Sequence, residues 1–404
     1  MNLGTIKRKI RVIVSDTDKL NPPIWGGPKR IWNLYSNLPQ DKFNIHYVGC
    51  DFSRVELKIN KLAPNFREFL IPCPRHYIKL WSPLNKKYFQ SLRFDAFVYL
   101  MMSSVKEFGN ALRKLKADVL ISSHPWSAPS MRKKKEQLFI YDAHNCEYSL
   151  TKALIKEHPL CGLISLWVKN IESAACKKSD IILVCSTQEK NEFIKLYGVK
   201  EEKIHIVPNG AVPRAINTSG DKAVAKEQLG LKGRKTAVFI GSYYEPNIRA
   251  AHFIIDKLAP DLKEYDFLIG GASLEIVFSS MNLPENVRFY GTLSAEKLDL
   301  IMKAADIALN PVLMGSGINI KMLDYMSYGL PVVSTECGAR GININGKMPL
   351  IISTPPEFAY NIRILDNDRA RYVKMSEDAR SLASGQYSWK IISSGLEKLI
   401  LNML

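Results

Sequence analysis

The chain has 404 residues, of which 46% are hydrophobic and 24% are charged. This length exceeds what one hydrophobic core usually supports, and the composition excludes a disordered or low-complexity protein, so we expect two globular domains. No apolar run approaches the ~20 residues that a membrane-spanning helix needs, and the first residues lack the apolar segment of a secretory signal. We therefore expect a cytoplasmic protein.

The net charge of +17 lies almost entirely in the first half of the chain. Residues 1–210 contain 34 Lys and Arg against 19 Asp and Glu, whereas residues 211–404 contain 22 against 20. A basic domain attracts phosphate-rich partners, such as an anionic membrane surface or a lipid-diphosphate acceptor. Residues 77–94 mix aromatic and basic side chains as membrane-interface segments do, although a core helix with solvated lysines has the same composition. Nucleic acid is not an expected partner, because only the charge favours it.

The seven cysteines are scattered and include no C-x-x-C pair. Reduced, mostly buried thiols are therefore expected, rather than a zinc or redox site.

In the first half, short runs rich in β-branched residues alternate with helical stretches. Most of these runs are continuously apolar, which is typical of parallel strands covered by helices on both faces. The runs begin at Ile10, Asn44, Ala117, Gln137, Ser179 and Lys203. The pattern predicts a doubly wound, Rossmann-like parallel sheet.

Residues 207–221 are rich in Pro, Gly, Asn and Ser, the composition of a linker. The alternation then resumes in runs that begin at Lys235, Tyr265, Asn286, Ala305, Pro331 and Pro349. We predict an α/β protein with one Rossmann-like domain at residues 1–210, a second at 211–385, and a C-terminal helix at 386–404.

The C-terminal helix is expected to pack back on the body of the protein. Ile392, Leu396, Leu399 and Met403 recur at helical spacing and should form its buried face. A membrane-surface helix would show the same stripe.

The stretch PVLMGSGINIKMLDYMSYGLPVVST follows an expected strand and contains the most informative motif. Gly315 and Gly317 would let the backbone approach a ligand, with Ser316 between them. The helix expected to begin near Ile318 and Asn319 would point its free N–H groups at that ligand. This arrangement suits a diphosphate.

Lys321 and Asp324 lie in the first turns of the same helix. The lysine would add a positive charge beside the phosphates, and the carboxylate can accept hydrogen bonds from both ribose hydroxyls. Together with the glycine turn, they predict a pocket for a nucleotide diphosphate.

This motif resembles the GT-B-fold retaining glycosyltransferases of family four, whose second domain carries Glu-x7-Glu followed by A-x-G-x-P-V-V. Asp324 matches the second acidic position, and Ser316 stands at the first. The resemblance implies two domains that face each other across a cleft, with the second domain binding the sugar nucleotide. It also implies that Lys321 and Asp324 act in catalysis.

Other segments of the second domain are similar to the same family. FIGSYYEPNIRAA places Gly241 in the turn that approaches the phosphates, and Ser242 where many members have Arg. FLIGGAS and VRFYGTLS, with Gly270, Gly271 and Gly291, are similar to the segments that line the nucleotide base.

The first domain contains two further segments that resemble the family. WGGPKRIWNLY is similar to its glycine turn, so Gly26 and Gly27 would open the following helix towards the sugar and acceptor. FIYDAHNCEY resembles its D-A-H-N-x-E segment, which implies that His144 hydrogen-bonds the transferring sugar or its acceptor. A buried structural histidine is the alternative, and His124 in SSHPW is a second cleft candidate.

Two D-x-D pairs, Asp16 with Asp18 and Asp366 with Asp368, look like the metal-binding pairs of a different glycosyltransferase fold. The first pair lies directly before the glycine turn and the second lies in a late polar loop, neither of which suits that role. A helix N-terminus with Lys321 can neutralise a diphosphate, so we expect no metal and no cofactor, the sugar nucleotide being a substrate.

The resemblance implies a retaining hexosyl or glycosyltransferase acting on a glycan or lipid-diphosphate acceptor. Its expected role is in cell-surface polysaccharide or lipopolysaccharide biosynthesis, at or near the inner membrane surface. Two alternatives stay open. The chain could be an inactive scaffold or regulatory subunit, because Ser316 and Ser242 replace residues that many relatives use, or a sugar-nucleotide epimerase of the same fold. A glycan phosphorylase fits less well, because it needs a lysine-bound pyridoxal phosphate.

Overall fold

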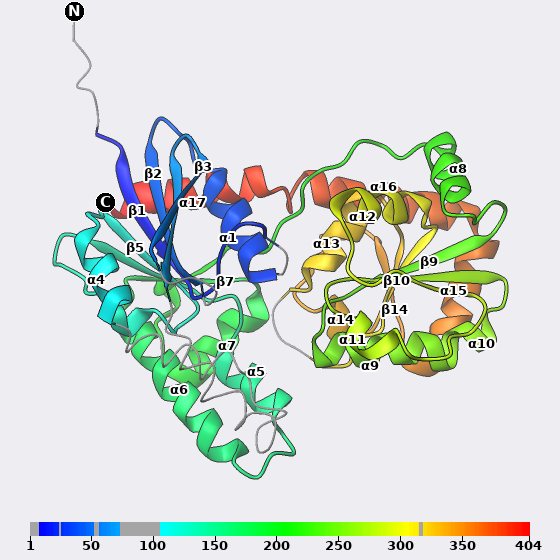
Figure 1. Cartoon of the computed structure of the whole chain (residues 1–404), viewed down its shortest axis with the longest axis horizontal. Helices are drawn as coiled ribbons and strands as arrows, with labels where there is room; N and C mark the ends of the chain where they lie inside the picture. Colours follow the sequence, from blue (N-terminus) through cyan, green and yellow to red (C-terminus); the bar gives the residue numbers. More distant parts are fainter. Residues whose placement is uncertain (1–7, 24–25, 52–55, 73–105, 315–317) are drawn as a thin grey trace, which may run out of the picture. The chain divides into compact units, whose positions relative to one another are not determined.

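Two sheets, each with its own helices, organise the chain (Figure 1). The computed structural model describes residues 8–23, 26–51, 56–72, 106–314 and 318–404. The chain divides after Pro208 into two units, and the first unit also takes the last residues, Ile392–Leu404.

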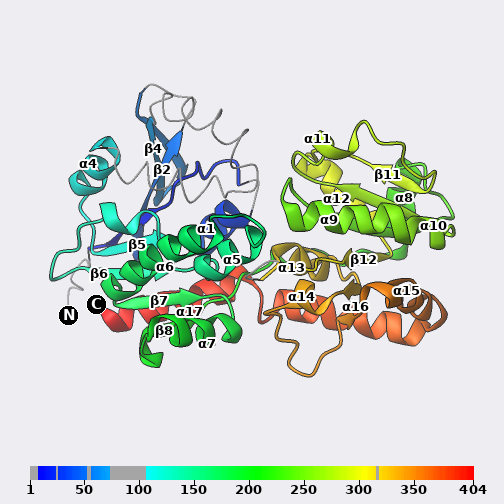
Figure 2. The ribbon, with the colours of Figure 1, turned by 90° about the horizontal axis from the view of Figure 1, so that it is seen from below.

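The sheet of the first unit has the order β3-β4-β2-β1-β5-β6-β7-β8 within the described residues, and Figure 2 shows its strands following one another across the unit. Neighbouring strands are parallel except β3 and β4. The strands are β1 (Ile10–Ser15), β2 (Phe43–Asp51), β3 (Lys58–Ala63), β4 (Phe66–Pro72), β5 (Val119–Ser123), β6 (Leu138–Asp142), β7 (Ile181–Val184) and β8 (Ile204–Ile206).

The antiparallel pair β3–β4 is absent from the sequence prediction. Strand β3 reads KINKLA and has no fully buried residue, because it lies at the edge of the sheet. An edge strand needs no continuous apolar run, so the pattern that identified the inner strands could not find it.

The helices of the first unit connect these strands. They are α1 (Gly26–Ser36), α4 (Lys106–Lys114), α5 (Glu147–Leu154), α6 (Cys161–Lys178), α7 (Thr187–Tyr197) and most of α17 (Trp389–Met403), with short 3-10 turns η1 (Ala128–Ser130) and η2 (Glu201–Lys203). Helix α7 shows why such segments start and stop where they do. Ser186 accepts a hydrogen bond from the Glu189 N–H at its start, and Gly198, with φ of 61°, ends it.

Helix α17 begins in the second unit and continues into the first. Ser393 Oγ donates to the Leu34 carbonyl at 2.7 Å, and Ile392, Leu396 and Ile400 are buried. The predicted stripe is wrong at its end, because Ile400 takes the buried position and Met403 is exposed. The stripe follows every fourth residue here, and the last turn extends beyond the surface that it covers.

The sheet of the second unit has the order β11-β10-β9-β12-β13-β14, and its strands are parallel throughout. All six predicted strands are present, as β9 (Lys235–Ile240), β10 (Tyr265–Gly270), β11 (Val287–Phe289), β12 (Ile307–Asn310), β13 (Val332–Ser334) and β14 (Leu350–Ile352). Strand order reverses between β9 and β12, and ligands of such sheets bind at the carboxyl ends of the strands beside that reversal.

Helices cover both faces of this second sheet. Figure 1 shows α8, α12, α13 and α16 along one side and α9, α10, α14 and α15 along the other. Their bounds, with those of two shorter elements and α11, are α8 (Ser219–Gln228), α9 (Glu245–Phe253), η3 (Ile254–Leu258), α10 (Ala259–Asp261), α11 (Glu275–Phe278), α12 (Ala295–Ala304), α13 (Ile320–Ser327), α14 (Glu336–Ala339), η4 (Pro355–Glu357), α15 (Phe358–Asn367) and α16 (Arg369–Ser384).

Some expectations concern segments outside the described residues. These are the predicted membrane-interface segment at 77–94 and Cys73. The other six cysteines are free thiols, four of them buried. None of the helices in the described ranges is long and apolar enough to cross a membrane.

Candidate functional site

Three glycine turns, at the carboxyl ends of β9, β10 and β11, lie together in the second unit. The Gly241 N–H donates to the Gly270 carbonyl at 2.9 Å, and the Gly271 N–H donates to the Gly291 carbonyl at 2.8 Å. Gly271 has φ of 139°, and a Cβ there would lie 1.5 Å from the Gly241 oxygen. A side chain at Gly271 would therefore push the turns apart. The fold thus assembles four of the predicted donor-site glycines.

Asn247, in the first turn of α9, connects these turns to Lys321. Its buried amide donates from Nδ2 to the Ser242 carbonyl at 3.3 Å and accepts at Oδ1 from Lys321 Nζ at 2.6 Å. Lys321 Nζ also lies 4.4 Å from the centroid of the ring of Phe239, the penultimate residue of β9. Ser242 and Lys321, both predicted site residues, hence belong to one polar network.

The partner of the Lys321 ammonium is uncharged. Within the described part of the chain no carboxylate pairs with it, and Asn247 is its hydrogen-bond acceptor. Burial lowers the pKa of the Lys321 amine to about 7. An anion bound beside it would raise that pKa again, because an opposite charge favours the protonated amine.

The chain that enters α13 is held by two side-chain hydrogen bonds. Asn209 Nδ2 donates to the carbonyl of the buried Ile318 at 3.3 Å. Asn319 is the N-cap residue, but its Nδ2 donates to the Gly338 carbonyl at 3.0 Å and does not cap the helix. The helix begins at Ile320, two residues after the predicted start, because Asn319 has extended backbone and serves as the N-cap residue.

Three predicted donor-site residues, Gly315, Ser316 and Gly317, lie outside the described residues. Their contacts with a diphosphate stay predictions.

Asp324 lies three residues beyond Lys321, so the two side chains are neighbours on the surface of α13. The next residue, Tyr325, accepts the Ile240 N–H at 2.8 Å through its hydroxyl oxygen. This bond ties α13 to the carboxyl end of β9, which fixes both predicted catalytic side chains of the helix relative to the glycine turns.

In the first unit, Gly27, His124 and His144 come together beside the carboxyl ends of β5 and β6. The two imidazole centroids are 4.1 Å apart. A Cβ on Gly27 would lie 3.6 Å from His124 Cε1 and 3.7 Å from His144 Nδ1. His124 has φ of 62°, a left-handed conformation that side chains seldom adopt outside constrained sites. Gly26, the fourth predicted residue of this group, is the exposed first residue of α1.

A buried ion pair lies next to His144. Asp142, the last residue of β6, accepts from Arg30 Nη2 at 2.7 Å and from the Tyr35 hydroxyl at 2.9 Å, and its Oδ2 lies 3.4 Å from His144 Nε2. Burial alone would raise the pKa of Asp142, but the Arg30 guanidinium and His144 outweigh burial and hold that pKa well below its usual range. The carboxylate therefore stays ionised.

The same surroundings keep His144 neutral. Burial, with a smaller effect of His124, lowers the pKa of His144 against the opposing attraction of Asp142. A neutral imidazole has one donor and one acceptor nitrogen and can orient a hydroxyl group.

The segment after His144 is held by Glu172 of α6. Cys146 gives α5 no side-chain cap, and instead the Glu172 carboxylate accepts the N–H groups of Glu147 at 2.9 Å and Tyr148 at 3.0 Å. Burial, and then the charge of Glu147, raise the pKa of Glu172 to about 7. Glu147 Oε1 in turn lies 4.0 Å from His124 Nε2. Glu172 thus fixes the segment that follows His144 and that carries Glu147 beside His124.

Sequence reasoning missed Asn247, Asp142 and Glu172. Asp142 stands in the D-A-H-N-x-E segment, so that motif was an available signal. Asn247 likewise stands in the FIGSYYEPNIRAA segment, whereas Glu172 lies in a helix with no distinguishing pattern, and only the packing of α6 against α5 gives it a role.

The two D-x-D pairs have protein partners. Asp16 Oδ1 accepts the Thr17 N–H at 2.8 Å and lies 3.3 Å from His124 Nδ1, while Asp366 Oδ2 pairs with Lys235 Nζ at 3.1 Å and Asp368 caps α16. No group of three or more His, Cys, Asp or Glu side chains with metal-binding geometry occurs in the described ranges. Metal independence stays a prediction.

Comparison with known families covers most of both units. The family described as "Glycosyltransferase Family 4" matches residues 26–214, and the family described as "Glycosyl transferases group 1" matches residues 234–368. The first match spans the two-histidine cluster, and the second spans the glycine turns and α13.

Individual relatives are distant. The D-inositol 3-phosphate glycosyltransferase of Rhodococcus jostii (strain RHA1) is 24% identical over 56% of this chain and 53% of the relative. That of Corynebacterium jeikeium (strain K411) is 25% identical over 69% and 71%, and the phosphatidyl-myo-inositol mannosyltransferase of Mycobacterium leprae (strain TN) is 24% identical over 48% and 52%. The chain therefore spans about half the length of the first and third of these relatives.

Solved structures share the fold over almost the whole chain. Sucrose-phosphate synthase from Thermosynechococcus elongatus has a TM-score of 0.75 at 15% identity and covers 98% of this chain and 99% of its own. HepE of Anabaena, in complex with UDP-glucose, has a TM-score of 0.65 at 12% identity over 97% and 100%. WaaG, a glycosyltransferase involved in lipopolysaccharide biosynthesis, has a TM-score of 0.65 at 15% identity over 96% and 99%. The predicted GT-B fold of two Rossmann-like domains is confirmed.

Proposed function

Because the chain belongs to the group 1, family 4 glycosyltransferases, we propose that it transfers a sugar from a nucleotide diphosphate to a glycan or lipid-linked acceptor. The named relatives favour an acceptor that carries phosphate, since their names specify inositol phosphate and phosphatidylinositol. The basic composition of residues 1–210 suits such an acceptor, and also suits a place at an anionic membrane surface in the synthesis of surface polysaccharide.

The observation that carries this proposal is the Lys321 ammonium, which has an uncharged partner at the carboxyl edge of the second sheet. Transfer of the sugar breaks its bond to the diphosphate, and negative charge accumulates on the leaving oxygen. Lys321 and the N-terminus of α13 would stabilise that charge more strongly in the transition state than in the ground state. The same two features supply the positive charge that a metal supplies in other transferases, so we propose that transfer needs no metal.

On the acceptor side, His144 is proposed to orient a hydroxyl of the sugar or acceptor. Its neutral imidazole is held between Gly27, His124 and the ionised Asp142. Family membership further favours retention, in which the acceptor attacks on the face from which the diphosphate leaves. Product analysis by NMR, through the anomeric coupling constant, tests retention.

A thermal-shift screen against UDP-, GDP-, ADP- and TDP-sugars tests the donor site. A ligand that binds only the folded state stabilises it by about 2.7 kcal/mol at a hundredfold excess over Kd. We expect one nucleotide class to stabilise the wild type in the presence of EDTA, and Lys321→Ala and Asp324→Ala to lose the response.

Lys263→Ala is the matched control, because this exposed lysine lies in the same unit, on the loop before β10, away from the glycine turns. It should respond as the wild type does. If no sugar nucleotide stabilises the wild type, an inactive scaffold becomes the better interpretation.

A further inference from the structure

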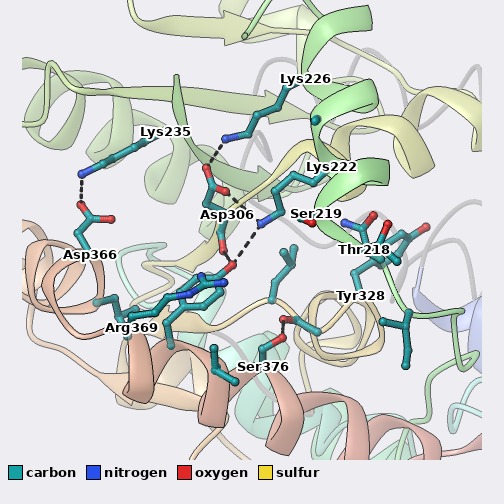
Figure 3. Close-up of a pocket in the computed structure, with 18 of the residues that line it drawn as sticks. Thr218, Ser219, Lys222, Lys226, Lys235, Asp306, Tyr328, Asp366, Arg369 and Ser376 are labelled. Atoms are coloured by element: carbon teal, nitrogen blue, oxygen red, sulfur yellow. Dashed lines mark hydrogen bonds and ion pairs between the residues drawn. The ribbon is translucent and has the colours of Figure 1, made fainter. Parts of the chain in front are cut away.

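A large cavity lies at the opposite edge of the second sheet from the glycine turns. It has a volume of about 950 Å³ and is lined by α8, by α16 and by the amino ends of β9 and β12 (Figure 3). Strand β9 has six residues and separates the cavity from Gly241, so the two places are about 20 Å apart along the strand. The cavity is therefore distinct from the candidate donor site.

Basic side chains face this cavity from both helices. Lys222 and Lys226 lie one turn apart on α8, and Arg369 and Arg380 lie on the face of α16 that also presents Tyr372 and Ser376. Figure 3 shows Lys222 and Arg369 entering the cavity from opposite walls. The lining contains seven Lys or Arg against four Asp or Glu, an excess of positive charge in a concave site.

The lysines of α8 have carboxylate partners inside the cavity. Asp306 accepts from Lys222 Nζ at 3.0 Å and from Lys226 Nζ at 2.6 Å, and Lys235 pairs with Asp366. The two pairs with Asp306 hold α8 against the sheet and offset part of the positive charge of that wall.

The arginines of α16 have no such partners among the described residues. The Arg369 guanidinium lies 5.1 Å from the centroid of the Tyr372 ring, and Arg380 Nη2 donates only to the Tyr328 carbonyl, at 3.4 Å. The remaining lining carboxylates, Glu227 and Glu377, form no ion pair with either arginine. Arg369 is also the first residue of α16, where the helix dipole disfavours a cation and favours an anion.

The absence of a side chain at Gly329 leaves room for the Arg380 guanidinium. With φ of 71°, Gly329 follows α13, and a Cβ on it would lie 2.1 Å from Arg380 Nε. The absent side chain lets the guanidinium lie against the end of α13, at the wall of the cavity.

We propose that this cavity binds a small phosphate ester, with Arg369 as the group that contacts its phosphate and Arg380 adding positive charge further along the cavity wall. Guanidinium groups recognise phosphate through two parallel N–H donors, and the exposed side chains of Ile216 and Val373 provide apolar surface for the organic part. The volume lies within the range of pockets that enclose small molecules. This site does not depend on the proposed transfer activity.

Calorimetric titration of the full chain at constant ionic strength tests the site, with glucose 6-phosphate, inorganic phosphate and sulfate as probes. We expect glucose 6-phosphate to bind the wild type more tightly than either inorganic anion does. Arg369→Gln should weaken that binding about tenfold or more, the usual loss of a charged hydrogen bond. Arg363→Gln, which removes an exposed arginine of α15 outside the cavity, should bind as the wild type does.

Two results would overturn the proposal. Equal binding by wild type and Arg369→Gln would place the ester elsewhere, and equal binding of sulfate and glucose 6-phosphate would reduce the cavity to a non-specific anion trap. Two variants distinguish this site from the donor site. Lys321→Ala should still bind glucose 6-phosphate, and Arg369→Gln should still respond to sugar nucleotides. If the donor proposal fails, the binding of glucose 6-phosphate by Lys321→Ala should be unchanged.

Discussion

Buried charged side chains at the carboxyl edges of the two sheets differ in their partners. In the first unit, Asp142 is fully buried and is neutralised inside the protein by Arg30, and Glu172 is saturated by backbone and tyrosine donors. In the second unit, Lys321 is held by an uncharged asparagine. The first edge is therefore complete before any ligand arrives, whereas the second edge lacks a negative charge that a diphosphate would supply.

The largest expected effect is a loss of folding stability when an ion pair is removed from the edge of the first sheet. Arg30→Met would leave Asp142 as a buried carboxylate without its ion pair, and should lower the free energy of unfolding by about 3 to 5 kcal/mol. Urea denaturation followed by circular dichroism measures the change.

Lys42→Met serves as its control, because the Lys42–Glu397 pair is half exposed. Solvent screens an exposed pair, so this variant should lose much less stability than Arg30→Met does. If both variants lose the same stability, the buried pair is not special and the contrast between the two edges fails.

A smaller effect is expected from the glycine turns of the incomplete edge. Gly271→Ala places a Cβ where the Gly241 oxygen lies, so the turns must separate and the affinity for a sugar nucleotide should fall at least about a hundredfold, or about 2.7 kcal/mol. Titration with the sugar nucleotide selected by the screen measures it.

Gly395→Ala is the matched control, since a Cβ there meets no atom within 4 Å in α17. It should leave affinity unchanged and stabilise the helix by up to about 1 kcal/mol. Unchanged affinity in Gly271→Ala would mean that the donor does not use these turns.

The smallest expected effect is a dependence of donor affinity on pH, which only the second edge should show. The pKa of Lys321 is lowered to about 7, so the ligand-free amine loses its charge as the pH rises through that value. Donor affinity should fall by at most about tenfold per pH unit above 7, or about 1.4 kcal/mol, and binding at pH 8 should take up a proton.

Calorimetry with the sugar nucleotide selected by the screen, in two buffers of different ionisation enthalpy, measures that uptake. Lys321→Gln should bind weakly with no dependence on pH. A flat affinity between pH 6 and 9 in the wild type would show that Lys321 keeps its charge without a ligand, and the second edge would then resemble the first.

Patterns in the sequence were sufficient for the inner strands of both sheets except β4, whose run FREFLIP is interrupted by charged residues, and for the order of the other strands. Continuous apolar runs occur only where helices cover both faces, so each run identified a buried parallel strand. The edge strand β3 and the buried register at the end of α17 escaped, because both depend on which surface a neighbour covers.

The sequence alone also predicted the chemistry that each unit could offer, since Gly241, Gly271, His144 and Lys321 stand in motifs that resemble those of the family. What only the tertiary structure decided is their electrostatic state. Asn247 is far from Lys321 along the chain, as Arg30 is from His144, and burial at these contacts lowers the pKa of both Lys321 and His144. Desolvation and hydrogen bonding act over a few ångströms in space, so no local pattern of residues can encode them.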